Sequence, residues 1–531
     1  MNKFQRHFIN LIFPAFVFGS ITGIFTSLVI ILYKLLAKFV IEFSENAYAF
    51  LSKALYIVPI VLVVLFGLSI LFSYIYKKQP RVSGGGIPSA IALLRSIVRF
   101  DWLKTLIGVF FMSLSSFLIG VPLGNEGPSV LMGTAIGKGS INLFAKKHPM
   151  WSRYTMTGGA CAGFAVATGA SVSGVMFAIE EAHQRISPMI LLVGTISVIS
   201  AQVVSQILCP MLGLSLTLFP SVPIITFAMS DLWIALVVGV IIGLFAVAFL
   251  KYYHLINKFF NVILKKVPHS VKIFIVYALT IVLGIISFSF ISTGHEIFSL
   301  VLKENIAIWG LAILLLVRIT LTLFANSNKL TGGVFVPILA IGALVASIVG
   351  KGLESLFGLS SAYYTAILVL GISACVSSMM KMPLTAIVFS LEVFGCVDNL
   401  IFIIIAVALS CIITEIFGVK GMNDNIVENI VKEQEETHER KVIDTHVTIK
   451  KGSFAENMHS KDILWPANFF LLSIAKNKSS IEQIDQQGEI VFSEGDILHV
   501  RYLTFDEEQT KEELNSIVGE QNYEESEPIT S

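Results

Sequence analysis

The sequence predicts an all-α membrane protein with many spanning helices, followed by a small soluble α+β domain. Of its 531 residues, 55% are hydrophobic and only 14% are charged, and the mean hydropathy is +0.80. These values differ strongly from those of a soluble globular protein. Glycine and proline clusters interrupt several apolar stretches, which predicts broken helices. The hydrophobic pattern stops near Gly418, where the soluble part follows.

The apolar stretches have the lengths that membrane helices need. A helix that crosses a bilayer requires about 20 apolar residues. Such stretches are predicted at Phe8–Lys34, Leu55–Tyr74, Leu103–Leu123, Met189–Leu208, Leu232–Leu250, Val271–Ile291, Ile308–Phe324 and Leu400–Phe417. Three interrupted pieces lie between them, at Thr157–Ile179, Phe335–Val349 and Thr365–Val393. We interpret these as discontinuous helices, which surround the substrate site in many transporters.

Composition and motif content exclude several classes of function. The net charge is +1 and no basic run is present, so nothing indicates a nucleic-acid partner. No metal-ligand spacing, nucleophile–base set or phosphate loop suggests an enzyme, a metal site or a cofactor. The five cysteines lie in apolar stretches without C-x-x-C spacing, and we interpret them as small buried hydrophobic residues. Lys3, Arg6 and His7 precede the first apolar run, which predicts a cytosolic N-terminus.

One stretch, Gly124–Val130, places a carboxylate between glycines and a proline inside hydrophobic sequence. An ionisable side chain at membrane depth is costly, so Glu126 is a candidate for ion or proton handling. Pro128 is typical of the first turn of a helix, whose free N–H groups and positive dipole end favour an anion. The alternative is a glutamate that caps the helix or reaches the membrane surface.

Two other stretches have the same chemistry, Ser83–Pro88 and Thr331–Pro337, each a glycine cluster closed by proline. Three exposed helix starts can form an anion pathway from backbone amides. The order of the three motifs, with a glutamate in the middle one, resembles the CLC family of chloride channels and chloride/proton antiporters. The resemblance covers the chain from about Phe8 to Glu433 and implies a CLC-like inverted repeat of tilted and broken helices.

An internal duplication agrees with this architecture. The segment from Gly159 to Glu180 resembles the segment from Gly371 to Glu392, at an offset of 392 − 180 = 212 residues. Pro128 pairs with Pro337 at an offset of 337 − 128 = 209. The repeat therefore predicts that Glu126 and Phe335 occupy equivalent positions where the two halves meet.

The resemblance implies roles for two acids. Glu126 matches the glutamate that gates the CLC pathway and couples it to protons, but Asn125 stands where the family usually has arginine. The missing arginine removes a positive charge from the mouth of the pathway. From the residues alone, Glu180 and Glu181 fit a solvated helix end better than a functional pair. The resemblance changes this balance, because Glu181 matches the internal proton-transfer glutamate of the antiporters.

Anion binding by resemblance falls mainly to backbone N–H groups. Those of Val334 and Phe335 match the central site, and those from Asn125 to Gly127 match its outer portion; Phe335 can also serve in packing. Two side chains of the family site are absent. Gly85 replaces a serine, and Asn423 replaces a tyrosine, so we expect a looser or differently tuned inner gate.

The predicted domains are a transmembrane anion transport domain at 1–433, a charged linker at 434–440, a soluble domain at 441–518 and a disordered acidic tail at 519–531. The soluble domain is expected to contain strands at Phe469–Ile474, Glu489–Phe492 and Gly495–Arg501 and a helix near Asp506–Ile517. Its pattern resembles the C-terminal subdomain of RCK-type regulators of potassium transport, which implies a small ligand or dimer contacts. A structural cap is the alternative.

The leading hypothesis is a homodimeric chloride/proton antiporter in the cell membrane, with its C-terminal domain in the cytosol. A fluoride/proton antiporter of the fluoride-specific CLC branch is the second hypothesis, because its members also lack the usual serine, tyrosine and arginine. A passive chloride channel and a membrane sensor that signals through the C-terminal domain are the remaining alternatives.

Overall fold

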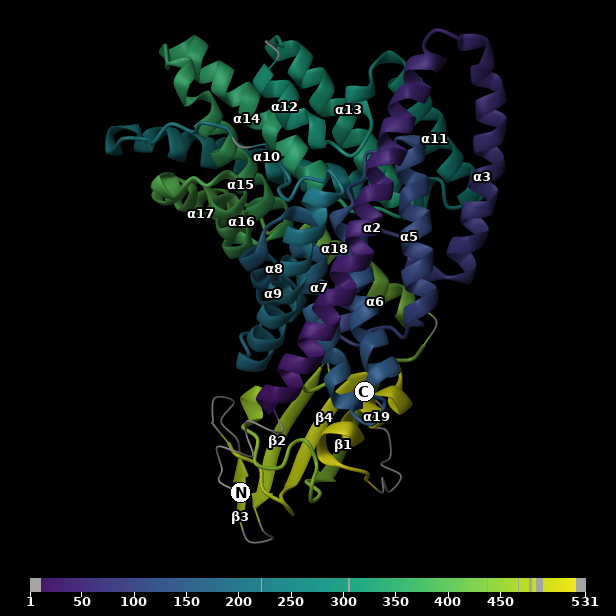
Figure 1. Ribbon diagram of the computed structural model, residues 1–531, viewed down its shortest axis with the longest axis vertical. Helices are drawn as coiled ribbons and strands as arrows, with labels where there is room; N and C mark the ends of the chain where they lie inside the picture. Colours follow the sequence, from purple (N-terminus) through teal and green to yellow (C-terminus); the bar gives the residue numbers. More distant parts are fainter. Residues whose placement is uncertain are drawn as a thin grey trace.

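The computed structural model describes residues 11–220, 222–303, 306–436, 438–466, 468–476, 480–483 and 490–521. A large body of helices lies above a small sheet domain (Figure 1). Ten helices in the described part are long and apolar enough to cross a membrane. Three features predicted from the sequence fall outside the described residues: the basic N-terminal residues, the start of the first span at Phe8, and most of the acidic tail.

The helices divide into two halves. The first half contains α2 (Phe13–Leu51), α3 (Val58–Lys78), α4 (Ile87–Leu94), α5 (Trp102–Ile119), α6 (Glu126–Phe144), α7 (Ser152–Thr168), α8 (Ser171–Phe177) and α9 (Pro188–Met211). The second half contains α10 (Leu232–Lys258), α11 (His269–Ile286), α12 (His295–Lys303), α13 (Ile308–Ser327), α14 (Phe335–Phe357), α15 (Tyr364–Met380), α16 (Pro383–Phe394), α17 (Leu400–Ile416) and α18 (Met422–Glu435).

Two predicted spans need correction. The first span does not end at Lys34, because α2 is a helix of 39 residues that runs from Phe13 to Leu51 and carries Lys34 in its interior. The piece at Phe335–Val349 is not broken, because α14 is a continuous helix of 23 residues. Its glycines serve close packing instead: a Cβ at Gly342 would lie 3.0 Å from the Cβ of Cys375 on α15.

The other two interrupted pieces do break where the sequence predicts. The first divides at Gly169, whose φ of +79° ends α7 before α8 begins. The second divides at Lys381, with a φ of +60°, and Pro383 then starts α16. A short π-helical turn, η5 (Ala178–Ala182), continues α8 and carries Glu181.

The two halves form the inverted repeat. Gly124 N–H donates to the Gly333 carbonyl at 2.6 Å, and Gly333 N–H donates back to Gly124 at 2.7 Å. The Glu180 carboxylate accepts hydrogen bonds from the first turn of α16, at Leu384 and Thr385. In the same way, the Glu392 carboxylate accepts from the first turn of α8, at Val172 and Ser173. Each half therefore caps a helix of the other, as a two-fold relation between the halves requires.

The C-terminal domain is a four-stranded antiparallel sheet with one helix. Its strands β1 (Lys441–Thr448), β2 (Phe469–Lys476), β3 (Ser480–Gln483) and β4 (Ile497–Thr504) lie in the order β1-β4-β2-β3, and α19 (Glu507–Val518) follows. The strand predicted at Glu489–Phe492 is wrong in its described part, where Val491 forms only an isolated bridge with His459. The strand β3 was not predicted.

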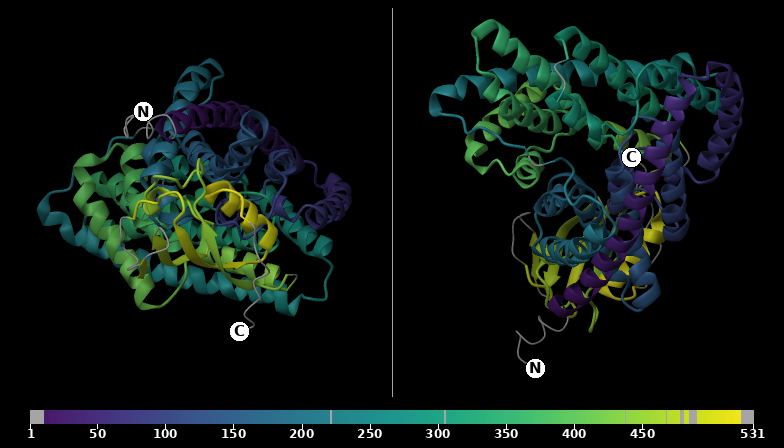
Figure 2. Two further views of the ribbon diagram at one scale, coloured as in Figure 1. Left: turned by 90° about the horizontal axis from the view of Figure 1, so that it is seen from below. Right: turned by 45° about the horizontal axis from the view of Figure 1, so that its top comes forward.

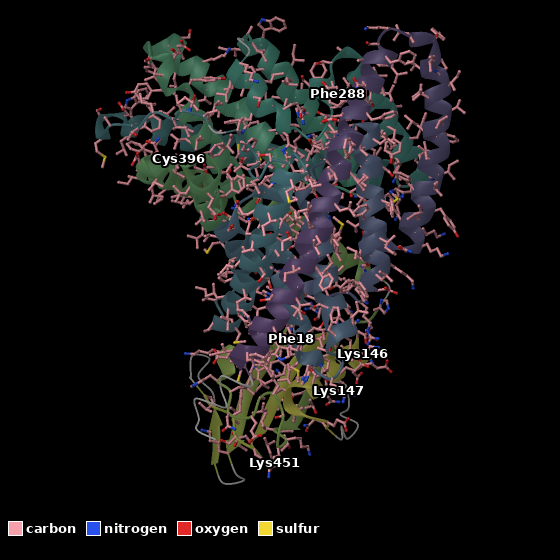
Figure 3. The ribbon with its side chains drawn as sticks, in the orientation of Figure 1. Phe18, Lys146, Lys147, Phe288, Cys396 and Lys451 are labelled. Atoms are coloured by element: carbon pink, nitrogen blue, oxygen red, sulfur yellow. The ribbon has the colours of Figure 1, made fainter. Side chains whose placement is uncertain are left out.

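The sheet domain packs against the ends of several membrane helices (Figure 2, left). Phe18 and Lys146 lie at this boundary, whereas Lys451 lies at the far end of the sheet domain (Figure 3). One apolar cluster includes Ala15 and Trp151 of the helical body together with Val447 and Leu514 of the sheet domain. The core of the sheet domain is therefore continuous with one apolar cluster of the helical body, while most of the helical core forms a separate cluster.

Candidate functional site

The three glycine–proline motifs meet at one point. Gly86 has a φ of +76°, and a Cβ there would overlap the backbone of Gly127. A Cβ at Gly127 would overlap the Gly85 carbonyl oxygen and lie 2.7 Å from Cα of Gly333. Only glycine permits backbones to approach this closely. The starts of α4, α6 and α14 consequently converge in the interior of the molecule.

Glu126 lies at this junction, as the first residue of α6, and its exposed fraction is 0%. Its carboxylate folds back over Gly124, since a Cβ there would lie 2.5 Å from Glu126 Oε2. Neither carboxylate oxygen has a hydrogen-bond partner among the described residues. The acid is therefore neither on the lipid-facing perimeter nor satisfied as a helix cap.

A cavity of about 190 Å³, the Lys34 cavity, lies on one side of this acid and is lined by Asn125, His295 and Lys34. The Nε2 atom of His295 is 3.4 Å from Asn125 Oδ1 and 3.8 Å from Glu126 Oε1. Lys34 Nζ donates to the carbonyls of Val166 at 3.1 Å and Ser215 at 3.3 Å.

Lys34 and His295 were not predicted as site residues. Each comes from a helix remote in sequence from Asn125, and only the fold brings them together. A lysine in the interior of an apolar helix was the available signal for Lys34, because such a charge must face protein or water. Lys34 thus gives the cavity beside Asn125 a basic side chain where the family's arginine is missing.

Val334 and Phe335 form the start of α14, equivalent to Asn125 and Glu126 at the start of α6. The amides of a first helical turn have no carbonyl partner within their own helix, so both starts present N–H donors. The Phe335 ring packs edge to face on Phe164 and Phe389, with centroid distances of 5.2 and 5.3 Å. Phe335 therefore does pack in the core, beside the backbone position predicted to bind the anion.

A second cavity, the Gly85 cavity, has a volume of about 380 Å³ and is lined by Gly84, Gly85 and Asn326. A Cβ at Gly85 would lie 3.7 Å from Asn326 Nδ2. The amide of Asn326 thus occupies the neighbourhood of the serine side chain that Gly85 lacks. Asn326 was not predicted, because it precedes the third glycine motif and carries no pattern of its own.

Glu181 lies in η5 with an exposed fraction of 3%, so it is not at a solvated helix end. Arg95 donates from Nη2 to the Glu181 carbonyl at 2.8 Å and from Nε to the Ala182 carbonyl at 3.0 Å. Asn423 is fully buried near the Glu181 carboxylate. Neither amide atom of Asn423 has a partner of hydrogen-bond geometry among the described residues.

An inverted repeat of broken helices around a buried acid defines a class of membrane transport protein. A family model described as voltage-gated chloride channel matches residues 66–415, more than half of the chain. The chain therefore belongs to this family, the CLC proteins.

Curated relatives are distant in sequence. The H(+)/Cl(-) exchange transporter ClcA of Klebsiella pneumoniae (strain 342) is 23% identical over 364 residues, covering 68% of this chain and 76% of the relative. ClcA of Salmonella arizonae is also 23% identical, over 363 residues, with the same coverage.

Solved structures share the fold. A slow cyanobacterial Cl-/H+ antiporter has a TM-score of 0.71 at 20% identity, covering 79% of this chain and 99% of its own. A CLC-type fluoride/proton antiporter has a TM-score of 0.64 at 20% identity, covering 78% and 97%. The all-α fold with its repeat, and the α+β region after it, agree with the prediction from sequence.

Proposed function

We propose that this protein exchanges chloride for protons across a membrane. The observation that carries the proposal is the buried Glu126 carboxylate, held without a hydrogen-bond partner among the described residues where three helix starts meet. A transport function agrees with the family and with the exchange transporters that the chain resembles.

The proposed mechanism is a competition between Glu126 and the anion for the same backbone amides. A charged carboxylate is attracted to the positive ends of α6 and α14, as a halide is. Protonation removes that attraction, so the neutral side chain leaves the amides and an anion replaces it. Each time an anion replaces the Glu126 carboxylate at the amides, the side chain leaves in its protonated form and so carries one proton.

Lys34 and His295 are proposed to serve the anion on the Glu126 side. Their cavity contains Asn125, whose amide has no charge, so Lys34 provides the positive charge that attracts the anion. Gly85 and Asn326 are proposed to contact the anion from the second cavity, through a backbone N–H and a side-chain amide. Val334, Phe335 and Gly127 contribute backbone N–H groups between the two.

Glu181 is proposed to transfer protons between the C-terminal-domain side and Glu126. Its burial allows it to be uncharged at neutral pH, as proton transfer requires. Asn423, beside it, is proposed to orient the carboxylate and to offer its amide to the anion in place of the family's tyrosine. Water is expected to complete the proton path.

We also propose a homodimer with the C-terminal domain in the cytosol. Domain boundaries at 433, 440 and 518, and the similarity of the last domain to RCK-type C-terminal subdomains, remain predictions, as does a small ligand of that domain. Two alternatives keep specific support: the departures at Gly85, Asn125 and Asn423 fit a fluoride/proton antiporter, and the lack of the serine and tyrosine side chains at Gly85 and Asn423 fits a passive channel.

Flux measurements on purified protein in liposomes test the proposal. A chloride gradient is expected to drive proton uptake, and the same uptake should disappear in Glu181→Gln. If only a fluoride gradient moves protons, the fluoride alternative replaces the proposal. Chloride flux without any proton movement would identify a channel.

A further inference from the structure

A third cavity, the Arg185 cavity, lies between the membrane helices and the C-terminal domain and has a volume of about 640 Å³. Five cationic side chains from both parts line it: Arg95, Arg153, Arg185, Lys432 and Arg440. A cavity of this size is in the range of sites that enclose organic ligands, about 300–1,000 Å³, and is much larger than an inorganic ion needs.

Most of these charges are not neutralised by protein. In the described part of the chain, the side chains of Arg185, Lys432 and Arg440 have no carboxylate within ion-pair distance. Two acids line the same cavity, Glu428 and Glu435, and Glu428 is already paired with Lys420. The cavity therefore has an excess of positive charge, which favours an anionic ligand.

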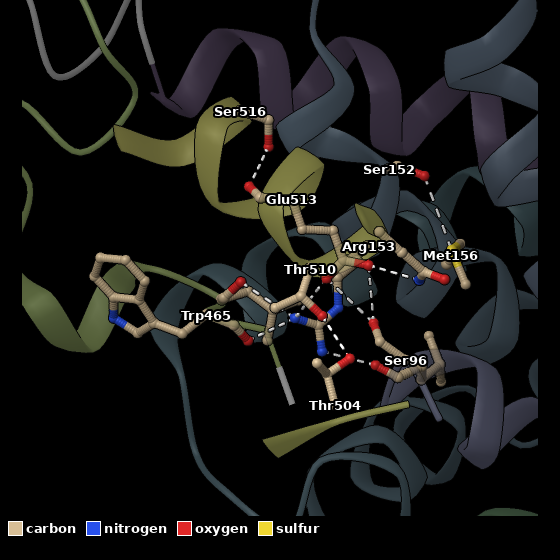
Figure 4. A network of polar contacts seen from close by, with 12 residues as sticks. Ser96, Ser152, Arg153, Met156, Trp465, Thr504, Thr510, Glu513 and Ser516 are labelled. Atoms are coloured by element: carbon tan, nitrogen blue, oxygen red, sulfur yellow. Dashed lines mark hydrogen bonds and ion pairs between the residues drawn. The ribbon is translucent and has the colours of Figure 1, made fainter. Parts of the chain in front are cut away.

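Two of the arginines, Arg95 and Arg153, belong to the helical body and donate hydrogen bonds to main-chain carbonyls. Arg153 donates from Nη1 to the Trp465 carbonyl at 2.5 Å and from Nη2 to the Leu94 carbonyl at 2.8 Å (Figure 4). Its only carboxylate neighbour within the described residues is Glu513, at 4.0 Å. The Nε atom of Arg153 has no acceptor there. Main-chain carbonyls therefore orient this guanidinium, and its one ion pair is long, an arrangement that leaves positive charge available for a phosphate.

Aromatic side chains form another part of the wall. Trp465 stacks on Phe469 with a centroid distance of 4.6 Å, and its Nε1 has no acceptor among the described residues. The Arg440 guanidinium lies over the Phe505 ring at 5.8 Å. Arginines beside aromatic rings suit a ligand that combines phosphate with an apolar or planar part.

We propose that the Arg185 cavity binds a phosphate-bearing organic anion. Its position admits two sources, a soluble nucleotide or the headgroup of an anionic phospholipid. Arg95 connects the cavity to the transport site, because it lines the cavity and also holds the carbonyls of Glu181 and Ala182. Occupancy of the cavity would alter proton transfer; this link, unlike the binding itself, rests on the role proposed for Glu181.

The test is calorimetry on the full-length protein in phosphatidylcholine nanodiscs, with ATP as the soluble probe. We expect saturable binding that weakens at least about tenfold in Arg185→Gln/Arg440→Gln, because each lost charge-assisted hydrogen bond is worth about tenfold or more. Lys451→Gln is the control: it also removes one positive charge, but at the far end of the C-terminal domain, and it should bind ATP like the wild type.

Nanodiscs that contain phosphatidylglycerol distinguish the lipid source. If the headgroup is the ligand, these discs raise the Tm of the wild type but not of the double variant, and ATP no longer binds. The proposal is overturned if neither ATP nor phosphatidylglycerol binds or stabilises, or if the double variant responds like the wild type. Chloride flux of the unliganded double variant verifies its fold, so failure of binding and failure of transport are separate results.

Discussion

The two halves of the repeat have the same scaffold but different chemistry at the junction. Glu180 caps α16 and Glu392 caps α8 through corresponding bonds, and Gly124 and Gly333 exchange equivalent hydrogen bonds. At the equivalent helix starts, however, the first half has Glu126 and the second has Phe335. The comparison indicates that symmetry holds the backbone amides in place, while the first half alone has a carboxylate at its helix start, the group to which we assign the coupling between ions.

The largest effect is expected from Gly127→Ala, which disturbs the close backbone packing that the two halves share. The new Cβ would overlap the Gly85 carbonyl, where neither backbone can move independently. We expect loss of flux and a destabilisation at or above the roughly 1–3 kcal/mol of ordinary overpacking, measured by thermal unfolding in detergent. Gly352→Ala in α14 is the control, since nothing lies within 4 Å of its Cβ. Equal behaviour of the two variants would contradict the close approach.

Glu126→Gln removes the titratable carboxylate that only the first half has, without changing the backbone scaffold. The amide has the size of the carboxylate but cannot titrate, so proton movement should stop while anion flux continues. Simultaneous recording of chloride and proton fluxes from liposomes measures both. Phe335→Leu is the companion variant in the other half, and proton coupling should persist in it. Unchanged coupling in Glu126→Gln would remove the role assigned to this acid.

Glu180→Gln and Glu392→Gln compare the two halves directly. Each weakens charge-assisted hydrogen bonds to one helix start, with an expected loss of about 1.5–3 kcal/mol. Because the bonds correspond, both variants should lower Tm by similar amounts. A large drop in Tm for one variant and none for the other would show that the two caps do not contribute equally to stability.

The smallest effect is expected from Lys34→Gln. Chloride uptake should fall a few-fold at low ionic strength, because the substitution removes a charge that attracts anions to the cavity. An impermeant salt near 1 M should abolish the difference, since the screening length is then about 3 Å. Lys53→Gln, near the end of α2 and outside this cavity, controls for general charge effects.

The helix starts at the three motifs were predictable from sequence because glycine and proline determine backbone conformation locally, and their order, which resembles the CLC family, implied that they share one pathway. The repeat offset was also sufficient to pair Glu126 with Phe335. Lys34, His295 and Asn326 were not predictable, since their proximity to the site depends on contacts between helices distant in sequence. The continuity of α14 escaped prediction for a related reason: a glycine that allows close packing has the same sequence signature as one that breaks a helix.

The apolar cluster that joins the sheet domain to the membrane part includes both Leu11, just before α2, and Val518, at the end of α19. Leu11 can therefore complete its packing only after the chain has been synthesised through α19. Until then, the newly inserted protein exposes an apolar face toward the aqueous phase, where a folding helper or a second nascent chain can bind. We expect a chain that stops before α19 to leave that face uncovered and to be less stable for that reason.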